Sequence, residues 1–282
     1  MLRSDGRTAD PAALTPPTVA MTPQLPTSFK HRFLFSLSAT SFVYPDDYVP
    51  NVRRLGPFMD AIELLFCESG ALPPERTIQE LAALALEHDL TYNVHLPSDV
   101  SIGHAAADQR GRAVEAILQV FELAQPLSPS TFTLHIPWED QPLAALPAAA
   151  WRQNVHHSLA ELIGTLGDPA RISVETLDYP LEWLAEVIDA LGLGICMDIG
   201  HLLLHGHDVQ RFFDRFAPRV AIIHLHGVDT GRDHLPLDRL SKPFEDSVMK
   251  VLSGFEGIVS LEVFAFDALA ASLDWLDTRF KI

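Results

Sequence analysis

Histidine and carboxylate side chains recur in this sequence where short apolar runs end, and both are ligands for divalent metal ions. The clearest case is residues 195–201, which read Ile-Cys-Met-Asp-Ile-Gly-His. The apolar run ends on Asp198, and His201 follows three residues later. Gly200, between them, allows a sharp turn out of a strand. A carboxylate at a strand end and an imidazole on the next turn can converge on one ion.

Similar side chains follow or end several other apolar runs. His95 and His135 each stand two residues before a proline, which would stop a strand. His224 and His226 share one face of a strand because side chains alternate. The candidates beyond Asp198 and His201 are His95, His135, Glu175, His224, His226, Asp233, His234 and Glu262.

These candidates are too many for one ion, since a tetrahedral zinc takes about four ligands. Glu175 and Glu262 lie inside apolar runs, where a carboxylate without a counter-charge is costly, so a cation is expected beside them. The set predicts about two or three divalent ions, zinc, iron or manganese, sharing a carboxylate and suited to phosphate chemistry. Two assignments stay open. Glu63 either lines a barrel or contacts substrate, and His226 either contacts substrate or orients a ligand.

Apolar strand-like runs alternate with helix-like segments along the chain. The predicted helices are Tyr48–Leu55, Ile78–Glu87, Asp108–Leu123, Ala148–Leu166, Leu181–Ala190, Val209–Phe216, Phe244–Leu252 and Ala268–Leu276. The predicted strands are Phe33–Ser38, Asp60–Cys67, Thr91–His95, Thr131–Ile136, Ile172–Thr176, Leu193–Asp198, Val220–His226 and Ile258–Val263.

Eight strand–helix units over about 250 residues are the size of a (β/α)8 TIM barrel, in the α/β class. We expect one such domain over residues 31–282. A doubly wound open sheet is the alternative, but no Gly-rich dinucleotide loop follows the first strand. Active sites of these barrels lie at the carboxyl ends of the strands, where the candidate ligands are found. Residues 1–30 are rich in Pro, Thr, Ala and Ser without periodicity, which predicts a disordered leader.

Charge and composition limit the possible partners and location. The 282 residues carry a formal net charge of −17, which disfavours nucleic-acid binding because that affinity comes mainly from Lys and Arg. Cys67 and Cys196 are expected to be reduced core residues, as in a cytoplasmic protein. No apolar run has membrane-spanning length, and residues 1–20 lack the apolar segment of a secretory signal. The oligomeric state is not predicted.

The pattern of Glu175, Asp198 with His201, His224 and Glu262 resembles the xylose isomerase-like, endonuclease IV-like superfamily of TIM barrels. Its sugar isomerase and epimerase branch typically keeps one metal ion, on positions like Glu175, Asp198, His224 and Glu262. The endonuclease IV branch adds imidazoles at positions matching His95, His135, His201 and His234, which implies three zinc ions and phosphodiester cleavage. One departure concerns the third ion. Endonuclease IV has Asp two residues before the His that matches His234, and this chain has Arg232 there, with Asp233 adjacent.

Three segments are similar to the cobamide-remodelling phosphodiesterases: residues 39–53 (ATSFVYPDDYVPNVR), 62–66 (IELLF) and 92–97 (YNVHLP). This resemblance implies hydrolysis of the nucleotide-loop phosphodiester of adenosylcobamides (coenzyme B12 and pseudo-B12), for cobamide remodelling and salvage. The products would be adenosylcobinamide phosphate and the α-riboside. Phe42–Tyr48 and Asp229–Leu240 are then candidates for the rim of a wide active site.

On this hypothesis Glu175 bridges two ions, and the other candidates divide between them. His95 and His135 complete one site, whereas Asp198, His224 and Glu262 complete the other. His201 and His234 either hold a third ion or bind the substrate phosphate. His226 or Asp233 acts as general acid or orients a ligand. The alternatives are a monometallic sugar isomerase or epimerase and, less favoured by the charge, an apurinic-site endonuclease.

Overall fold

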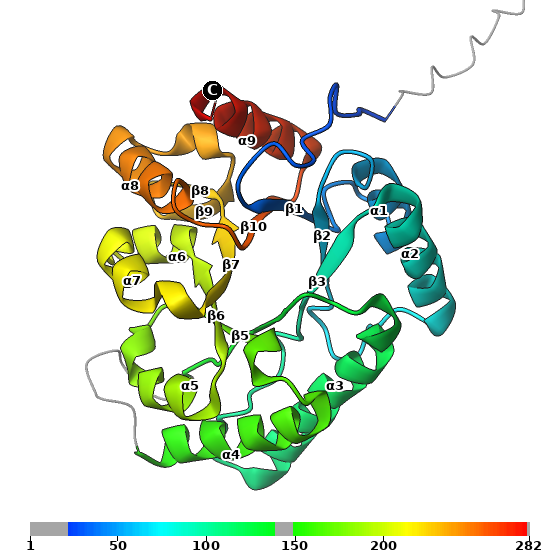
Figure 1. The fold of residues 1–282 in the computed structure, drawn as a ribbon. Helices are drawn as coiled ribbons and strands as arrows, with labels where there is room; N and C mark the ends of the chain where they lie inside the picture. Colours follow the sequence, from blue (N-terminus) through cyan, green and yellow to red (C-terminus); the bar gives the residue numbers. More distant parts are fainter. Residues whose placement is uncertain (1–21, 139–148, 281–282) are drawn as a thin grey trace, which may run out of the picture.

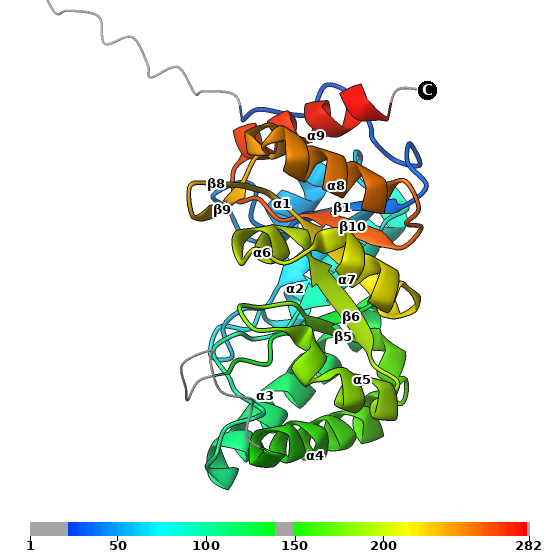
Figure 2. The same ribbon diagram turned by 90° about the vertical axis from the view of Figure 1, so that its left-hand side faces the viewer.

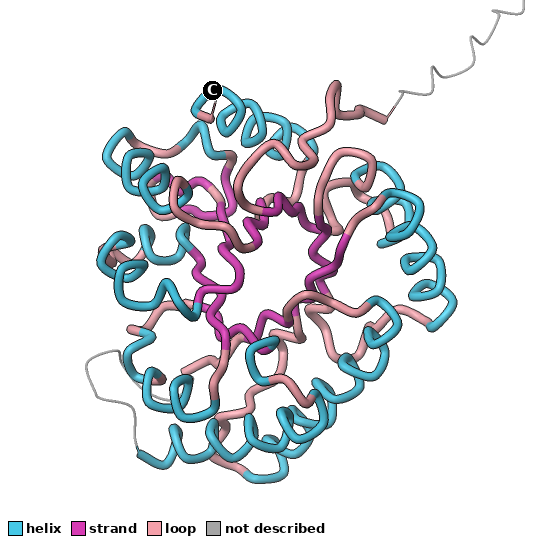
Figure 3. Tube along the Cα trace, in the orientation of Figure 1, coloured by secondary structure: helices cyan, strands magenta, loops and turns pink. Residues whose placement is uncertain are grey.

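The computed structural model describes residues 22–138 and 149–280. Eight parallel strands close into a barrel, in the order β1-β10-β7-β6-β5-β4-β3-β2. Figure 1 looks into this barrel, and Figure 3 shows the strands as a ring inside the helices. The predicted TIM barrel is therefore confirmed. None of the described helices is both long and apolar enough to cross a membrane.

The observed elements lie close to the predicted ones. The barrel strands are β1 Ser36–Thr40, β2 Ala61–Leu65, β3 Thr91–His95, β4 Phe132–Leu134, β5 Ile172–Glu175, β6 Gly194–Asp198, β7 Val220–Leu225 and β10 Ile258–Leu261. The helices are α1 Tyr48–Leu55, α2 Glu75–His88, α3 Ala107–Ala124, α4 Ala149–Leu166, α5 Ala185–Leu191, α6 Ile199–Leu204, α7 Val209–Phe216, α8 Lys242–Leu252 and α9 Phe266–Arg279. Short 3-10 turns connect some of them: η1 Gln125–Leu127, η2 Pro169–Arg171, η3 Leu181–Trp183, η4 Ala217–Arg219 and η5 Leu237–Arg239.

The inside of the barrel is polar below the strand ends. Strand side chains alternate, so in β2 the apolar Ile62 and Leu64 lie on the opposite face from Glu63. Glu63 contacts His224 of β7 and Ser260 of β10, which places it in the barrel interior. Other fully buried polar residues of the strands include Ser38, Thr40, Asn93, Thr133 and Ser173. The interior can therefore hold carboxylates and imidazoles by hydrogen bonds.

A two-stranded hairpin follows β7 and was not predicted. The predicted strand 220–226 ends at Leu225, and the chain continues as β8 Gly227–Asp229 and β9 Arg232–Leu235. These strands pair antiparallel, with Gly227 opposite Leu235. The hairpin lies beside α6, as the side view of Figure 2 shows. A Cβ on Gly227 would stand 2.2 Å from the Pro236 carbonyl oxygen, so only glycine fits this close return of the chain.

The segment before β1 corrects the predicted leader of residues 1–30. Residues 1–21 lie outside the described residues. From residue 22 on, however, the chain packs against the barrel, since Leu25 and Phe29 are each only 5% exposed. The Phe29 amide donates to the Phe58 carbonyl at 2.9 Å, and the Tyr44 hydroxyl donates to the Pro23 carbonyl at 2.9 Å. The folded domain therefore begins before residue 31.

Candidate metal centre

Imidazoles and carboxylates from the carboxyl ends of six barrel strands meet at one end of the barrel. The ligand atoms form several groups, each with all its atoms within 4.8 Å of one another, and all but one of the groups share Glu175. The groups are His95 with His135 and Glu175; Glu175 with Asp198, His224 and Glu262; Glu175 with Cys196 and His224; and His201 with His226 and His234. The structure thus brings together the ten predicted residues except Asp233, which lies at the edge of the last group.

His224 and Glu262 carry the clearest indication of a cation. The His224 Nε2 lies 3.0 Å from Glu63 Oε1, so this nitrogen carries the proton and donates it. Its Nδ1 then directs a lone pair toward Glu262 Oε2 at 3.2 Å. Both atoms are buried without a hydrogen-bond partner among the described residues. Two buried acceptors that face each other need a proton or a metal ion between them.

Glu175 lies between two groups of imidazoles. Its Oε2 is 2.9 Å from His135 Nε2 and 3.4 Å from His95 Nε2. Its Oε1 is 3.6 Å from His224 Nδ1. The other His95 nitrogen, Nδ1, lies 2.8 Å from the Leu96 carbonyl and donates to it, which leaves Nε2 free as a ligand. Glu175 therefore lies where both groups of ligands could share its carboxylate.

The short helix α6 positions Asp198 and His201. Asp198 is its N-cap, and its Oδ1 accepts from the His201 amide at 2.7 Å. The His201 Nδ1 lies 3.1 Å from the Thr176 carbonyl, to which it donates, so its Nε2 keeps a lone pair. Thr176, just after Glu175, also accepts from the Asp198 amide through its hydroxyl at 2.8 Å. The predicted turn at Gly200 is thus the first turn of this helix.

The β8–β9 hairpin delivers His234 to the same centre. Its Nε2 lies 3.5 Å from Glu262 Oε2, and its Nδ1 lies 3.1 Å from Asp233 Oδ1. Asp233 thus orients His234. The backbone of His234 is left-handed, with φ of 51°, which is uncommon outside glycine and occurs at functional sites. Arg232, where endonuclease IV has an Asp, is exposed.

His226 has both ring nitrogens engaged by protein groups. Its Nδ1 accepts from the His234 amide at 2.9 Å, and its Nε2 lies 3.2 Å from Asp198 Oδ1. Burial lowers the pKa of His226 and Asp198 raises it, with a net rise. A second ring proton would nevertheless point at the His234 amide, so we assign the neutral ring with its proton on Nε2. In this arrangement His226 supports Asp198 and is not free to bind an ion.

The charges of the centre depend on one another. Burial favours neutral Glu175, but the charges of His135 and His224 prevail and hold its pKa well below the ordinary value. Burial likewise disfavours charged His95, yet hydrogen bonds with Cys67 and Glu175 raise its pKa well above the ordinary value. For His234, burial is outweighed by the Glu262 carboxylate beside it, and the pKa rises to about 9. Protons thus balance the carboxylates here, and a divalent cation could replace them.

The sequence prediction named His226 and Asp233 as possible orienting residues, but it left Glu63 without a role and missed Thr176. Glu63 was noted without a settled role, and the structure places it against His224 and Ser260. The sequence feature that could have revealed its role is a carboxylate inside an otherwise apolar strand. Thr176 could not be identified, because its contacts with Asp198 and His201 depend on the pairing of β5 with β6. The mid-helix His156 and His157 are exposed, as predicted.

Comparisons with known proteins agree with this architecture. A family model described as a xylose isomerase-like TIM barrel matches residues 49–279. No curated protein sequence matches the chain.

Several solved structures share the fold. A D-tagatose 3-epimerase-like protein has 21% identity and a TM-score of 0.71, covering 87% of this chain and 97% of that one. Endonuclease IV from Thermus thermophilus has 17% identity and a TM-score of 0.66, covering 86% and 99%. The IOLI protein with a bound zinc atom has 14% identity and a TM-score of 0.65, covering 87% and 98%. At these identities the likeness is one of fold.

Proposed function

This chain belongs to the family of xylose isomerase-like TIM barrels, and from that premise we propose that it is a metal-dependent phosphodiesterase. The observation that supports the proposal best is the position of Glu175 between two groups of ligands. A single-ion site would use only one of these groups. His95 and His135 would then have no ligand function, although both face Glu175 Oε2.

The residues divide their work according to these contacts. His95, His135 and Glu175 would hold one ion, and Glu175, Asp198, His224 and Glu262 would hold another. Bound divalent ions supply Lewis acidity, which stabilises the attacking and leaving oxygens of a phosphodiester. His201 and His234 stand beside these groups with nitrogens available for a phosphate oxygen or a third ion. Glu63, Asp233 and His226 keep the imidazoles and Asp198 in place.

For the substrate we propose an adenosylcobamide, cleaved at its nucleotide-loop phosphodiester to adenosylcobinamide phosphate and the α-riboside. The support is the resemblance of residues 39–53, 62–66 and 92–97 to the cobamide-remodelling phosphodiesterases. Residues 41–47 follow β1 and the hairpin follows β7, so both lie at the end of the barrel that holds the metal centre. Two aromatic rings pack together there, since the Phe42 ring lies 5.1 Å from the ring of Tyr48, the first residue of α1, between centroids.

The test combines metal analysis with turnover. Protein loaded with Zn, Mn or Fe is incubated with adenosylcobalamin, and adenosylcobinamide phosphate is sought by chromatography. We expect more than one tightly bound ion per chain, and His135→Ala should lose one ion and the activity. The matched control is His156→Ala, because His156 is exposed on α4. Recovery of intact cobamide under every metal loading would refute the substrate, and one ion per chain would refute the multinuclear site.

A sugar isomerase or epimerase is the second candidate, supported by the D-tagatose 3-epimerase-like structure. Such an enzyme would need only Glu175, Asp198, His224 and Glu262 for its ion, with His95 and His135 contacting substrate. It would keep full metal content in His135→Ala and would interconvert ketose epimers. The metal count of that single variant therefore separates the two candidates.

A further inference from the structure

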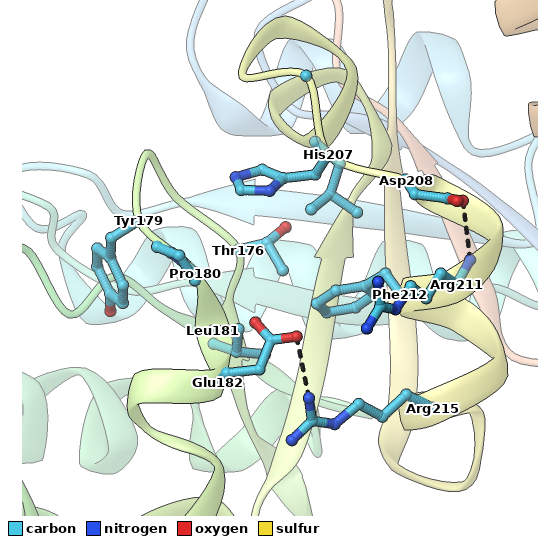
Figure 4. A pocket seen from close by; sticks show the side chains of 12 residues that line it. Thr176, Tyr179, Pro180, Leu181, Glu182, His207, Asp208, Arg211, Phe212 and Arg215 are labelled. Carbon is cyan, nitrogen blue, oxygen red and sulfur yellow. Dashed lines mark hydrogen bonds and ion pairs between the residues drawn. The ribbon is translucent and has the colours of Figure 1, made fainter. Parts of the chain in front are cut away.

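A cavity of about 380 Å³ lies in the helical layer behind the metal centre. One wall is the segment from the end of β5 to η3, and the other is formed by α6, α7 and the loop between them. Figure 4 shows Thr176, Glu182, His207 and Phe212 around this space. Its inner end is formed by Thr176 and Leu202, the residues that follow Glu175 and His201 in sequence. The cavity is thus next to the metal centre, on the far side of the β5 and β6 ends.

The inner surface of this cavity is apolar and partly aromatic. Tyr179 and Leu181 are each 2% exposed, Leu202 is 4% exposed and Phe212 is 7% exposed. The Tyr179 hydroxyl is already engaged, since it donates to the Ile136 carbonyl at 2.7 Å. These side chains therefore offer a ligand flat or apolar contact surfaces. A volume of this size falls in the range of about 300–1,000 Å³ typical of small-molecule sites.

The polar groups of the cavity leave one cation unpaired. Arg215 pairs with Glu182 across the cavity at 3.1 Å. Asp208 uses its carboxylate as the N-cap of α7, accepting from the Arg211 amide at 3.0 Å, as the dashed lines in Figure 4 indicate. The Arg211 guanidinium makes no ion pair with any residue in the described ranges 22–138 and 149–280. A guanidinium binds phosphate and carboxylate groups with two parallel hydrogen bonds.

We propose that this cavity is a second binding site, for a small anion that carries a phosphate or carboxylate on a flat apolar body. Arg211 binds the anionic group, and Phe212 with Leu181 and Leu202 contacts the body. The ligand is either a distal part of the substrate or a separate small molecule. The site does not depend on the proposed function, because its residues are not metal ligands.

Phenyl phosphate is a suitable probe because it has both features. Calorimetric titration uses the full chain after chelator treatment, so that phosphate cannot bind to metal ions. We expect one equivalent to bind, and Arg211→Ala to weaken binding by about tenfold or more, as loss of a charged hydrogen bond does. Inorganic phosphate, which lacks the ring, should bind more weakly than phenyl phosphate.

Arg76→Ala is the matched control, because Arg76 is also an exposed arginine, on α2, and does not line this cavity. It should bind phenyl phosphate as the wild type does. Equal binding by Arg211→Ala and the wild type would overturn the proposal, as would no binding at millimolar probe. Equal weakening by both variants would also overturn it, since that result indicates general charge attraction.

A second measurement identifies the source of the ligand. With metal-loaded protein and adenosylcobalamin, Arg211→Ala raises KM without changing kcat if the cavity binds a part of the substrate. An unchanged KM together with lost phenyl phosphate binding assigns the cavity to a separate small molecule. Only this arm rests on the proposed function, so absence of turnover leaves the titration result intact.

Discussion

The hydrogen bond on one imidazole nitrogen decides which nitrogen remains for a cation. In His224 the proton sits on Nε2 because Glu63 accepts it, so Nδ1 faces Glu262. In His234 the arrangement is reversed, with Asp233 beside Nδ1 and Nε2 toward Glu262. Two histidines that bind through different nitrogens can thus approach the same carboxylate from different strands. Such partners fix ring orientation and raise the basicity of the ligand.

Replacing Glu63 tests this orienting role. Glu63→Gln keeps the size of the side chain, but its amide can donate to His224 and so favours the wrong tautomer. We expect metal affinity to fall by about 10–100-fold while the fold is retained. Competition with a fluorescent chelator measures the affinity, and circular dichroism checks the fold. Glu80→Gln, an exposed change on α2, is the control. Unchanged affinity in Glu63→Gln would show that His224 needs no carboxylate.

Metal binding should depend on pH in the direction set by the raised histidine pKa values. In the metal-free protein His234 is protonated below its pKa of about 9, because the neighbouring Glu262 carboxylate outweighs the effect of burial. A metal ion must displace this proton, so affinity should rise from pH 6 toward 9 and then level off. Each displaced proton gives a change of about tenfold per pH unit.

The slope can be measured by metal titration at several pH values. His234→Gln should have a shallower slope than the wild type, and His156→Ala should keep the wild-type slope. If instead His234→Gln kept the wild-type slope and His156→Ala had the shallower one, the displaced proton would not come from His234.

Gly200 leaves the space that His226 occupies. A Cβ at this position would lie 2.0 Å from His226 Cε1. Gly200→Ala should therefore push the ring away from Asp198 and reduce the free energy of unfolding by about 1–3 kcal/mol. Gly164→Ala is the control, since nothing lies within 4 Å of a Cβ there, and alanine in a helix should stabilise by up to about 1 kcal/mol. Urea denaturation measures both, and equal stabilities would contradict the close contact.

At the scale of the elements, regular periodicity was predictable and short connections were not. Helices α1 and α7 have the predicted bounds, because their apolar residues recur at helical spacing. Strand β1 begins at Ser36, three residues later than predicted, and the two phenylalanines before it, Phe33 and Phe35, stack on each other with centroids 4.9 Å apart. The β8–β9 hairpin has only three and four residues per strand, too few for an alternating pattern.

The hairpin can be displaced through its first residue. In Gly227→Ala the new Cβ would meet the Pro236 carbonyl, so the hairpin must shift and carry His234 away from Glu262. We expect weaker binding of the ion nearest His234, with the ion at His95 and His135 retained. Metal analysis after dialysis against increasing chelator concentrations should show that the variant loses one ion at a lower chelator concentration than the wild type does. Gly254→Ala, with open space around its Cβ, should lose its ions as the wild type does.

At the scale of the whole molecule, the barrel followed from the count of strand–helix units, and the ligand positions followed from the barrel. What the sequence did not reveal is the packing of residues 22–30, since Leu25 and Phe29 are isolated apolar residues among proline and serine. No periodicity marks such a segment. Its burial depends on the partners Phe58 and Tyr44, which tertiary structure alone brings near.

The net charge gives a prediction for nucleic acids. With 20 Lys and Arg against 37 Asp and Glu, the chain should not bind duplex DNA containing an abasic site, even at low salt. Electrophoretic mobility shift at about 50 mM salt and at higher salt measures this. Binding that weakens steeply with salt would indicate a basic groove and favour the endonuclease interpretation. Endonuclease IV itself would serve as the positive control.

The segment before β1 and the last helix, α9, pack together along one side of the barrel. Arg32 pairs with Asp277 of α9, and the Phe280 ring lies 5.4 Å from Phe33. Tyr44, which the Pro23 carbonyl engages, stacks on Phe266 of α9 at 5.6 Å. The described ends lie near opposite ends of α9, so a circular permutant needs a linker that spans this helix, about 20 Å. Opened at an exposed connection far from the metal centre, such a permutant should close the same ring. The order in which the strands are synthesised would then change, while the ligands would still meet at the same end.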